Sequence, residues 1–316
     1  MDIDILLGLQ EFRNGGGGFL ADFLKKMTFL GELNTTLVIL AVIYWCVHKE
    51  LGVYLMMGWS GNRIVNGAMK ITACAYRPWI RDARIVPYGD SMTTATGYSF
   101  PSGHTMNAGT TFGGGALRKG CSRPLRVTLL VIVALVAFSR IFLGVHTPQD
   151  VLTGAAASLL VMGLTGLLMK WIEAHPKKDW IVACAGMGLC ALLAVYAALK
   201  PYPEDLDAEG KVIVDGAKMA IDTYKGVGWA AAFLTGWVLE RRYAGFSTDG
   251  IPVAGRLARC AAGLLGFYLI SLILMPLIRE WLPGAAGAAV ASFIQMFYIT
   301  FLFPLGIRMV EKAKRK

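Results

Sequence analysis

The sequence predicts an all-α, polytopic membrane helix bundle with about eight or nine transmembrane helices. Three observations favour this class: 55% of the 316 residues are hydrophobic, only 16% are charged, and several apolar runs approach the length needed to span a bilayer. A soluble domain carries about 25% charged residues, and a spanning helix needs about 20 predominantly apolar residues. The charges are therefore too few to cover a water-soluble globule.

Nine apolar segments are candidate spans once their flanks are included. They lie at about residues 33–48, 51–70, 104–117, 125–143, 150–170, 179–198, 224–240, 260–279 and 285–308. The second segment contains Asn62, Arg63 and Asn66 and is polar for a lipid-facing helix, so we expect it to be buried within the bundle. Charged residues and a glycine run at 15–18 interrupt residues 1–31, which we expect to be interfacial.

We expect three parts along the chain. They are an interfacial N-terminal segment at 1–31, a membrane core at 32–175 that carries the polar motifs described below, and additional C-terminal transmembrane helices at 176–316. No internal repeat indicates a transporter-style duplication. The N-terminus lacks the basic and apolar regions of a cleaved signal peptide. Six scattered cysteines form no CxxC pair and are expected to be packing residues.

The net charge of +10 is concentrated in short connections between the apolar segments. Basic residues gather at 118–126, at 171–178, at 241–259 and in a tail that includes Arg308, Lys312, Lys314, Arg315 and Lys316. The positive-inside rule predicts that these connections are cytoplasmic. The N-terminus and the connections 71–103, 144–149, 199–223 and 280–284 then lie outside. Because no basic face or nucleic-acid reader motif is present, we expect no nucleic-acid partner.

Polar residues gather in three short motifs, where membrane chains usually avoid them. The first motif is Lys70, six residues, then Arg77-Pro78; the second is Pro101-Ser102-Gly103-His104; the third is Ser139-Arg140, five residues, His146, three residues, Asp150. Under the predicted topology all three lie at membrane ends on the same outer side. Helices from distant parts of the chain can converge there.

The motifs contain the groups that a phosphate dianion requires. Lys70, Arg77 and Arg140 supply three cations, and guanidinium groups match phosphate oxygens with two parallel hydrogen bonds. Each such charge-assisted hydrogen bond contributes roughly 1.5–3 kcal/mol. Ser102 and Gly103 open the third predicted span, and backbone N–H groups at a helix start beside a hydroxyl form an anion site.

Two of the four histidines belong to these motifs. His146 precedes Asp150 by four residues, so the carboxylate can orient one ring nitrogen and leave the other free to attack phosphorus. His104 can donate the proton to the departing alkoxide. The other two, His48 and His175, lie beside lysines at predicted cytoplasmic ends and are expected to be interface residues. Nucleophile, orienting carboxylate, acid and cations together make the set for phosphoryl transfer.

Each of these residues also has a structural explanation when it is taken alone. Ser102 can be an ordinary N-cap, and residues 147–150 can start a helix with proline in its first turn. Starting a helix there would also help to aim His146. Arg63 is a weaker candidate, either for shaping the site or for a structural ion pair or cap.

The segments KITACAYRP, PSGH and SRIFLGVHTPQD resemble the three-part signature of the type 2 phosphatidic acid phosphatase (PAP2) superfamily, also called the lipid phosphate phosphatases. Eleven signature positions agree with no departure, which is far more specific than one short motif. The signature covers residues 70–150. The order of spans looks like the glucose-6-phosphatase and sphingosine-1-phosphate phosphatase branch, because two predicted spans precede the first motif.

The resemblance implies a role for each matched residue. Phosphate would be bound by Lys70, Arg77, Ser102, Gly103 and Arg140. His104 would be the general acid, and His146 would form a phosphohistidine intermediate with Asp150 orienting it. Members of this family use no metal, so the resemblance implies no cofactor.

We therefore expect an integral-membrane phosphatase that acts on a lipid phosphate or a polyprenyl diphosphate in phospholipid metabolism. Membrane lipids and the lipid-phosphate substrate are its expected partners. A bacterial inner membrane, with the active site on the extracytoplasmic side, suits the lack of targeting signals. Two alternatives are a sugar-phosphate phosphatase of the glucose-6-phosphatase kind and a non-enzymatic anion or lipid transporter. A vanadium haloperoxidase could use the same cations, but those enzymes are soluble.

Overall fold

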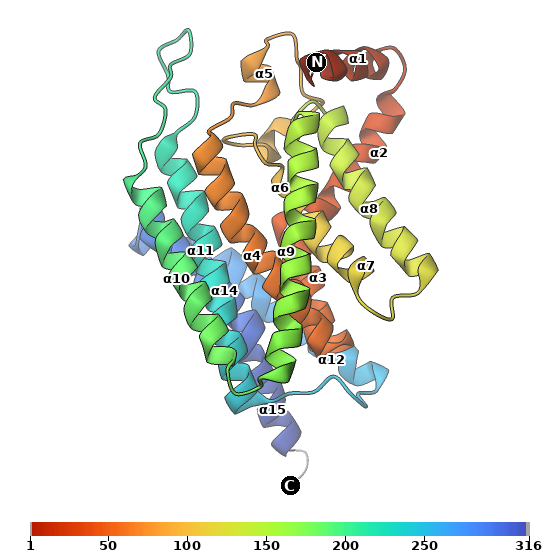
Figure 1. The fold of residues 1–316 in the computed structure, drawn as a ribbon, viewed down its shortest axis with the longest axis vertical. Helices are drawn as coiled ribbons and strands as arrows, with labels where there is room; N and C mark the ends of the chain where they lie inside the picture. The colour runs from red at the N-terminus through yellow and green to blue at the C-terminus, as the bar shows by residue number, and fades with distance from the viewer. Residues whose placement is uncertain (1, 314–316) are drawn as a thin grey trace. The chain divides into compact units, whose positions relative to one another are not determined.

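The computed structural model describes residues 2–313, which are mostly helical and contain no β-strand, only an isolated bridge between Leu206 and Val212. The basic tail residues Lys314, Arg315 and Lys316 lie outside the described residues. The α-helices are α1 Asp2–Asn14, α2 Gly18–Thr28, α3 Leu33–Val42, α4 Lys49–Ala73, α5 Pro78–Arg81, α6 Gly103–Ala108, α7 Gly114–Leu117, α8 Arg123–Phe142, α9 Pro148–Ala174, α10 Asp179–Leu199, α11 Gly216–Leu239, α12 Val253–Leu269, α13 Met275–Trp281, α14 Gly284–Phe297 and α15 Phe303–Ala313 (Figure 1).

Short 3-10 and π-helical turns join many of these helices. The 3-10 turns are η1 Phe29–Gly31 and η3 Ser91–Thr94, and the π-helical turns are η2 Ile43–Val47, η4 Gly109–Gly113, η5 Glu240–Ala244, η6 Ile270–Leu274 and η7 Tyr298–Leu302. Where a π-helical turn lies between two α-helices, the helical path continues through it. A helix of membrane-spanning length can therefore consist of two α-helices and the π-helical turn between them.

The predicted all-α membrane bundle is confirmed, and fewer helices than the predicted eight or nine have both the length and the apolar composition of a membrane span. Within residues 2–313, five helices are long and apolar enough to cross a membrane: Arg123–Phe142, Pro148–Ala174, Asp179–Leu199, Val253–Trp281 and Gly284–Ala313. The bent pair Gly18–Gly31 and Leu33–Val47, with an angle of 55° between its parts, makes a sixth if it is one span.

Three predicted spans account for the difference, although each is helical. Residues 51–70 lie in α4, which contains Arg63 and Lys70. Residues 104–117 form only the short run from α6 to α7. Residues 224–240 begin inside α11, after its polar first half. The burial expected for the polar helix α4 is confirmed at Asn62 and Asn66, which are 1% and 7% exposed.

Contacts between Cα atoms divide the chain into two compact units. The first unit consists of the described residues of 1–37, 65–162 and 201–219, and the second of those of 38–64, 163–200 and 220–316. All eleven signature positions belong to the first unit. The division predicted at residues 31 and 175 is based on the positions of the motifs and not on contacts between Cα atoms. It stays a prediction.

In the first unit the N-terminal helices pack on the helix that carries Arg140. Helix α2 lies along α8, and Ala21 and Leu24 of α2 bury their side chains against Phe142 of α8 (Figure 1). Helix α6 contacts both α8 and the turn η1. The second motif, at the start of α6, is thereby held beside the third motif at the end of α8.

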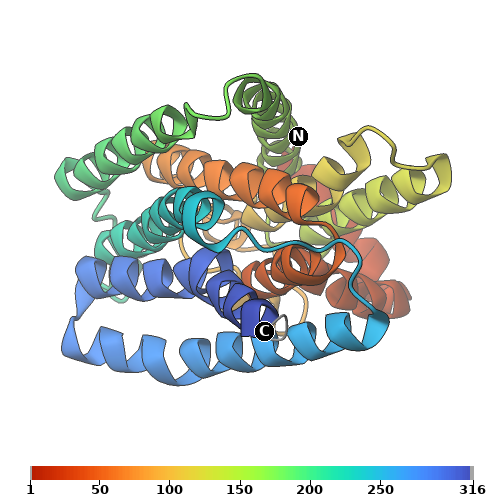
Figure 2. The ribbon, with the colours of Figure 1, turned by 90° about the horizontal axis from the view of Figure 1, so that it is seen from below.

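The second unit is built around aromatic contacts and a buried ion pair. The indole of Trp45 packs edge-on to Phe303 and donates its N–H to the carbonyl of Ile299 at 2.8 Å. The carboxylate of Glu240 is buried and accepts a hydrogen bond from Nζ of Lys49 at 2.7 Å. Figure 2 shows the helical run from α12 to α13 beside the run from α14 to α15. A short turn joins the end of α13 to the start of α14.

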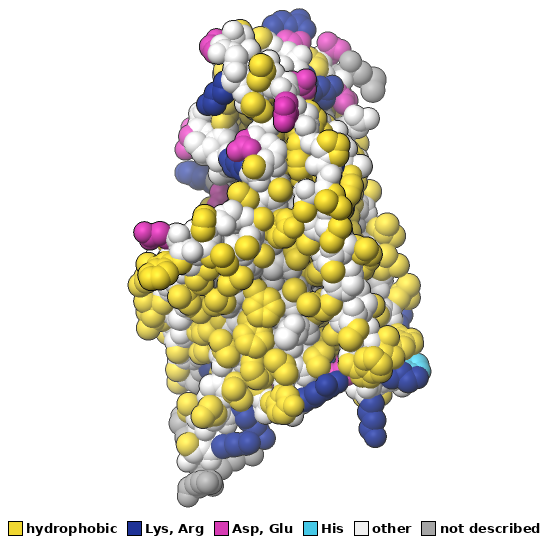
Figure 3. Space-filling view, turned by 90° about the vertical axis from the view of Figure 1, so that its left-hand side faces the viewer, with side chains coloured by type: hydrophobic (Ala, Val, Ile, Leu, Met, Phe, Trp, Pro, Cys, Tyr) yellow, Lys and Arg dark blue, Asp and Glu magenta, His cyan; other side chains and the backbone are white. Residues whose placement is uncertain are grey.

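Large hydrophobic side chains remain exposed along the long helices. In α10, Leu192 and Leu199 are 67% and 78% exposed, and in α12 Leu257 is 65% exposed. Hydrophobic side chains form a continuous area over the face drawn in Figure 3. A soluble monomer rarely exposes apolar patches larger than a few hundred square ångströms, so this surface fits contact with lipid tails.

Candidate active site

The two cations of the first motif lie on either side of the end of α4, with Lys70 inside the helix and Arg77 after it. Lys70 lies in the last turn of α4, where its Nζ donates to the carbonyls of Tyr98 at 2.8 Å and Pro101 at 3.4 Å. The helix ends at Ala73, and Cys74 takes a left-handed φ of 45°. The chain then turns away from the helix axis before Arg77, which precedes α5.

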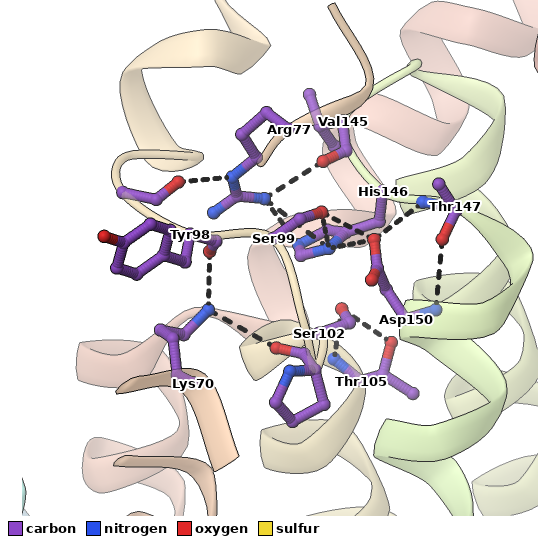
Figure 4. A network of polar contacts seen from close by, with 12 residues as sticks. Lys70, Arg77, Tyr98, Ser99, Ser102, Thr105, Val145, His146, Thr147 and Asp150 are labelled. Carbon is purple, nitrogen blue, oxygen red and sulfur yellow. Dashed lines mark hydrogen bonds and ion pairs between the residues drawn. The ribbon is translucent and has the colours of Figure 1, made fainter. Parts of the chain in front are cut away.

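Arg77 is buried in a ring of backbone carbonyls. Its Nε donates to Gly97 at 3.0 Å, its Nη1 to Val145 at 3.0 Å and its Nη2 to Thr96 at 3.1 Å. The same Nη1 lies 2.9 Å from Nε2 of His146 (Figure 4). Burial lowers the pKa of Arg77 to about 10, so it remains a cation at neutral pH.

His146 and Asp150 meet as the spacing of four residues predicts. Nδ1 of His146 lies 3.4 Å from Oδ2 of Asp150 and 3.4 Å from Oγ of Ser99. Oδ2 of Asp150 also accepts hydrogen bonds from the Ser99 hydroxyl at 2.5 Å and from the backbone N–H of Thr147 at 2.8 Å (Figure 4). The carboxylate is therefore fixed by a hydroxyl and a backbone donor while it faces the imidazole.

The electrostatic surroundings keep His146 neutral. The residue is 1% exposed. Burial and the neighbouring guanidinium of Arg77 hold the pKa of His146 well below its ordinary value, against the opposing effect of Asp150. A neutral imidazole retains the lone pair that a nucleophile or hydrogen-bond acceptor needs.

The second motif is attached directly to the third. Ser102 is fully buried and is the N-cap of α6, where its hydroxyl accepts from the N–H of Thr105 at 3.4 Å and from the Thr105 hydroxyl at 3.0 Å. The backbone N–H of Ser102 donates to the carbonyl of Asp150 at 3.0 Å. Asn66 of α4 donates to the carbonyl of Pro101 at 3.5 Å. The capping explanation of Ser102 is thus present in the structure.

Gly103 and His104 are the first two residues of α6. The backbone of His104 lies so close to Gly31 that a Cβ placed on that glycine would be 2.9 Å from the His104 carbonyl oxygen. The turn η1 therefore supports the helix start that carries His104. Both histidines of the motifs belong to the first unit.

Arg140 reaches the site from α8 and is fully buried. Its Nη1 donates to the hydroxyl of Thr28 at 2.8 Å, while its Nε and Nη2 have no hydrogen-bond acceptor among residues 2–313. The carbonyl of Arg140 accepts from the N–H groups of Val145 and His146, both at 3.1 Å. The backbone of Arg140 thus fixes the turn that presents His146.

The weaker candidate Arg63 belongs to the second unit. Its guanidinium lies over the ring of Trp59, 5.3 Å from the ring centroid. A role for Arg63 in shaping the site stays a prediction.

Two hydroxyl residues beside the site were not predicted from the sequence. Ser99 contacts His146 and Asp150, and Thr28 contacts Arg140. Ser99 precedes the second motif by two residues, and its position next to PSGH is the one signal that could have indicated it. Thr28 lies 112 residues before Arg140 in an amphipathic stretch, where no local pattern distinguishes it from any other threonine.

The arrangement has the chemical parts of an anion site with a nucleophile. Three cations, a buried helix start and a neutral imidazole oriented by a carboxylate belong to one compact unit. Arginine can only donate hydrogen bonds, so the contact with Arg77 places the lone pair of His146 on Nε2. The proton is then on Nδ1, on the side of Ser99 and Asp150.

Comparison with known proteins finds two family models that match the chain. Residues 50–177 match the model described as the PAP2 superfamily, and residues 224–315 match the transmembrane extension of PAP2 superfamily phosphatases. The first match contains all three motifs, whereas residues 1–49 lie outside both matches.

Two curated relatives resemble the chain. Lipid phosphate phosphatase delta from Arabidopsis thaliana is 24% identical over 189 residues, which cover 56% of this chain and 43% of the relative. Phosphatidylglycerophosphatase B from Bacillus subtilis (strain 168) is 27% identical over 159 residues, covering 46% of this chain and 73% of the relative. The chain thus spans less than half the length of the Arabidopsis protein. No solved structure matches it significantly.

Proposed function

Because this chain belongs to the PAP2 superfamily and carries both its phosphatase domain and its transmembrane extension, we propose that it is an integral-membrane phosphatase. The substrate is a lipid phosphate or a polyprenyl diphosphate, hydrolysed through a phosphohistidine. The observation that carries this proposal is the position of His146, with Nδ1 facing Asp150 and Nε2 facing the donor of Arg77. A phosphoryl group bound by Arg77 would lie beside the lone pair on Nε2.

The reaction proceeds in two steps. Nε2 of His146 attacks phosphorus, the bond from phosphorus to the leaving oxygen breaks, and His104 donates its proton to that oxygen. The leaving oxygen belongs to an alkoxide when the substrate is a monophosphate and to the remaining phosphate when it is a diphosphate. In the second step His104 accepts a proton from water, the water oxygen attacks the phosphohistidine, and the nitrogen–phosphorus bond breaks to release phosphate. Asp150 stabilises the positive imidazole that forms between the steps.

Five groups bind phosphate: Lys70, Arg77, Ser102, Gly103 and Arg140. The positive charge of this set stabilises the negative charge that develops on the phosphoryl oxygens. Because these cations belong to the chain, we expect hydrolysis without added metal ion. Activity that survives dialysis against EDTA would support metal-independent catalysis, and activity restored only by Mg²⁺ would contradict it.

The substrate is a lipid because the site belongs to an apolar membrane bundle and both relatives carry lipid phosphatase names. Phosphatidic acid, phosphatidylglycerophosphate, sphingoid-base phosphates and polyprenyl diphosphates are the candidates. The basic connections, read with the positive-inside rule, support a site on the extracytoplasmic side, and the membrane we propose is a bacterial inner membrane. A panel of lipid phosphates, lipid diphosphates and sugar phosphates, assayed in detergent by phosphate release, decides among these and the sugar-phosphate alternative.

Trapping the intermediate tests the mechanism. Purified protein is mixed with a ³²P-labelled lipid phosphate and quenched with alkali, under which a phosphohistidine survives. We expect label on the wild type and on His175→Ala, because His175 lies after α9 and outside the three motifs, and none on His146→Ala. Full hydrolysis by His146→Ala would overturn the mechanism, and no phosphate release by the wild type would favour a transporter.

A further inference from the structure

The N-terminal helices make specific polar contacts with the segments that surround the third motif. The side chain of Gln10 accepts from the N–H of Val86 at 2.7 Å and donates to the carbonyl of Arg84 at 2.9 Å. Arg13, which is buried, donates to the carbonyls of Val86 at 2.6 Å and Phe142 at 3.0 Å. Phe142 is the last residue of α8, two positions after Arg140. Helices α1 and α2 are therefore built into the first unit.

Arg140 needs support that its own helix does not provide. Arg140 and Arg77 are both buried cations, and they repel each other. Arg77 is held by three backbone carbonyls. Within residues 2–313, the guanidinium of Arg140 donates to the hydroxyl of Thr28, and its Nε and Nη2 have no acceptor. Before an anion arrives, repulsion from Arg77 would move an unsupported guanidinium of Arg140 away from the site.

We propose that Thr28 is a positioning residue for phosphate binding, because its hydroxyl holds Nη1 of Arg140 and leaves Nε and Nη2 available to an incoming phosphate. This inference rests on the proposed function. Thr28 lies outside the residues that match the family models, so nothing in the signature assigns it a role.

The local structure makes Thr28 suitable for this role. It ends α2 and is 7% exposed, and its β-branched side chain has few rotamers. A guanidinium carries five N–H donors, so the single bond to Thr28 leaves four for phosphate oxygens. The Nε and Nη2 edge, which has no acceptor among the described residues, has the geometry that binds two phosphate oxygens side by side.

The test is direct binding of radiolabelled inorganic phosphate by equilibrium dialysis in detergent, which requires no turnover. Thr28→Val keeps the shape and removes the acceptor, and we expect its Kd for phosphate to rise about 10-fold, since a hydrogen bond to a charged group is lost. Thr28→Ser restores the acceptor and should bind within about twofold of wild type. Kinetic assays should show the loss of Thr28→Val mainly in KM if it acts through binding.

Thr110→Val is the matched control. Thr110 is also a fully buried threonine of the first unit, but its hydroxyl donates to the carbonyls of Met106 and Asn107 in its own helix. We expect phosphate binding by Thr110→Val to stay within about twofold of wild type. A similar fall in thermal stability for Thr28→Val and Thr110→Val, with lost binding in the first variant alone, would support the proposal.

A double-mutant cycle separates positioning from a general loss of structure. In an Arg140→Ala background, Thr28→Val should cause no further loss of phosphate binding, because the group it positions is absent. Wild-type binding by Thr28→Val, or an equal loss in both backgrounds, would overturn the inference. If Thr28→Val is not recovered folded, Thr28→Ala is measured in the same way. Phosphate binding without lipid-phosphate hydrolysis by the wild type would instead contradict the proposed function.

Discussion

Nη1 of Arg77 lies 2.9 Å from Nε2 of His146, although 69 residues separate the two along the chain. Because arginine only donates, Nε2 is the acceptor and Nδ1 carries the proton. The carboxylate of Asp150 is on the Nδ1 side, 3.4 Å away. The imidazole is thus already in the tautomer that the proposed attack by Nε2 requires.

We expect Ser99 and Asp150 to contribute unequally to kcat. Ser99→Ala removes the hydroxyl donated to Oδ2 of Asp150, but the donor from Thr147 remains, so we expect kcat to fall about 10-fold. Asp150→Asn removes the charge that orients and stabilises the imidazole of His146, and we expect a fall of about 10⁴-fold. Steady-state hydrolysis of a lipid phosphate measures both. Equal losses in the two variants would show that Ser99 does more than hold the carboxylate.

The depressed pKa of His146 predicts a pH dependence of folding stability. The unfolded imidazole takes up a proton near pH 6.5, whereas burial and Arg77 keep the folded imidazole neutral. Below pH 6.5 the unfolded state therefore binds more protons, and the free energy of unfolding falls as the pH is lowered. Above pH 6.5 this contribution is constant.

Thermal unfolding in detergent between about pH 5 and 7 measures the effect, because most carboxylates titrate below this range. We expect a shallower fall of the melting temperature for His146→Gln, which cannot take up the proton, than for the wild type. Exchange of His175, a partly exposed histidine after α9, for glutamine is the control and should leave the slope unchanged. Identical slopes for wild type and His146→Gln would contradict the neutral state of His146.

Gly31 is expected to tolerate no side chain. A Cβ at this position would lie 2.7 Å from Cγ1 of Val136 and 2.9 Å from the carbonyl oxygen of His104. Gly31→Ala should lower the free energy of unfolding by about 1–3 kcal/mol, as overpacking does, and should also lower kcat because the start of α6 moves. Gly8→Ala in α1 is the control, since no atom lies within 4 Å of its new Cβ. We expect that control to be as stable as wild type or up to about 1 kcal/mol more stable.

A side-chain hydrogen bond connects the loop after α10 to the first motif. The hydroxyl of Tyr76 donates to Oδ2 of Asp205. Partial burial and this carboxylate raise the pKa of Tyr76 to about 12, so the phenol stays protonated and able to donate at neutral pH. Tyr76→Phe and Asp205→Asn should each loosen the loop and speed tryptic cleavage after the exposed Lys211.

The double variant should be cleaved no faster than either single variant, because both changes break the same bond. Glu204→Gln, an exposed change in the same loop, is the control and should leave the cleavage rate at the wild-type value. Additive effects of Tyr76→Phe and Asp205→Asn would mean that the two residues hold the loop independently.

Local patterns in the sequence predicted much of this protein. Apolar runs predicted a helical membrane bundle, and the spacing of four between His146 and Asp150 predicted a contact that the structure contains. Both depend on residues close in the sequence, although His146 lies in the turn before α9 and only Asp150 lies in the helix, so the contact forms across the helix start. The number of spans was less predictable. An apolar run indicates a helix, but the helical run 103–117 is too short for a span, and the charged residues of α4 make that helix too polar.

Only the tertiary structure decided how distant residues combine. The contact of Arg77 with His146, that of Ser99 with Asp150 and that of Thr28 with Arg140 join residues 51 to 112 positions apart. No periodicity relates residues at such separations, because their contacts depend on how α2, α6 and α8 pack. The sequence by itself determined which chemical groups are available, and the packing of helices determined which of them hold the others in place.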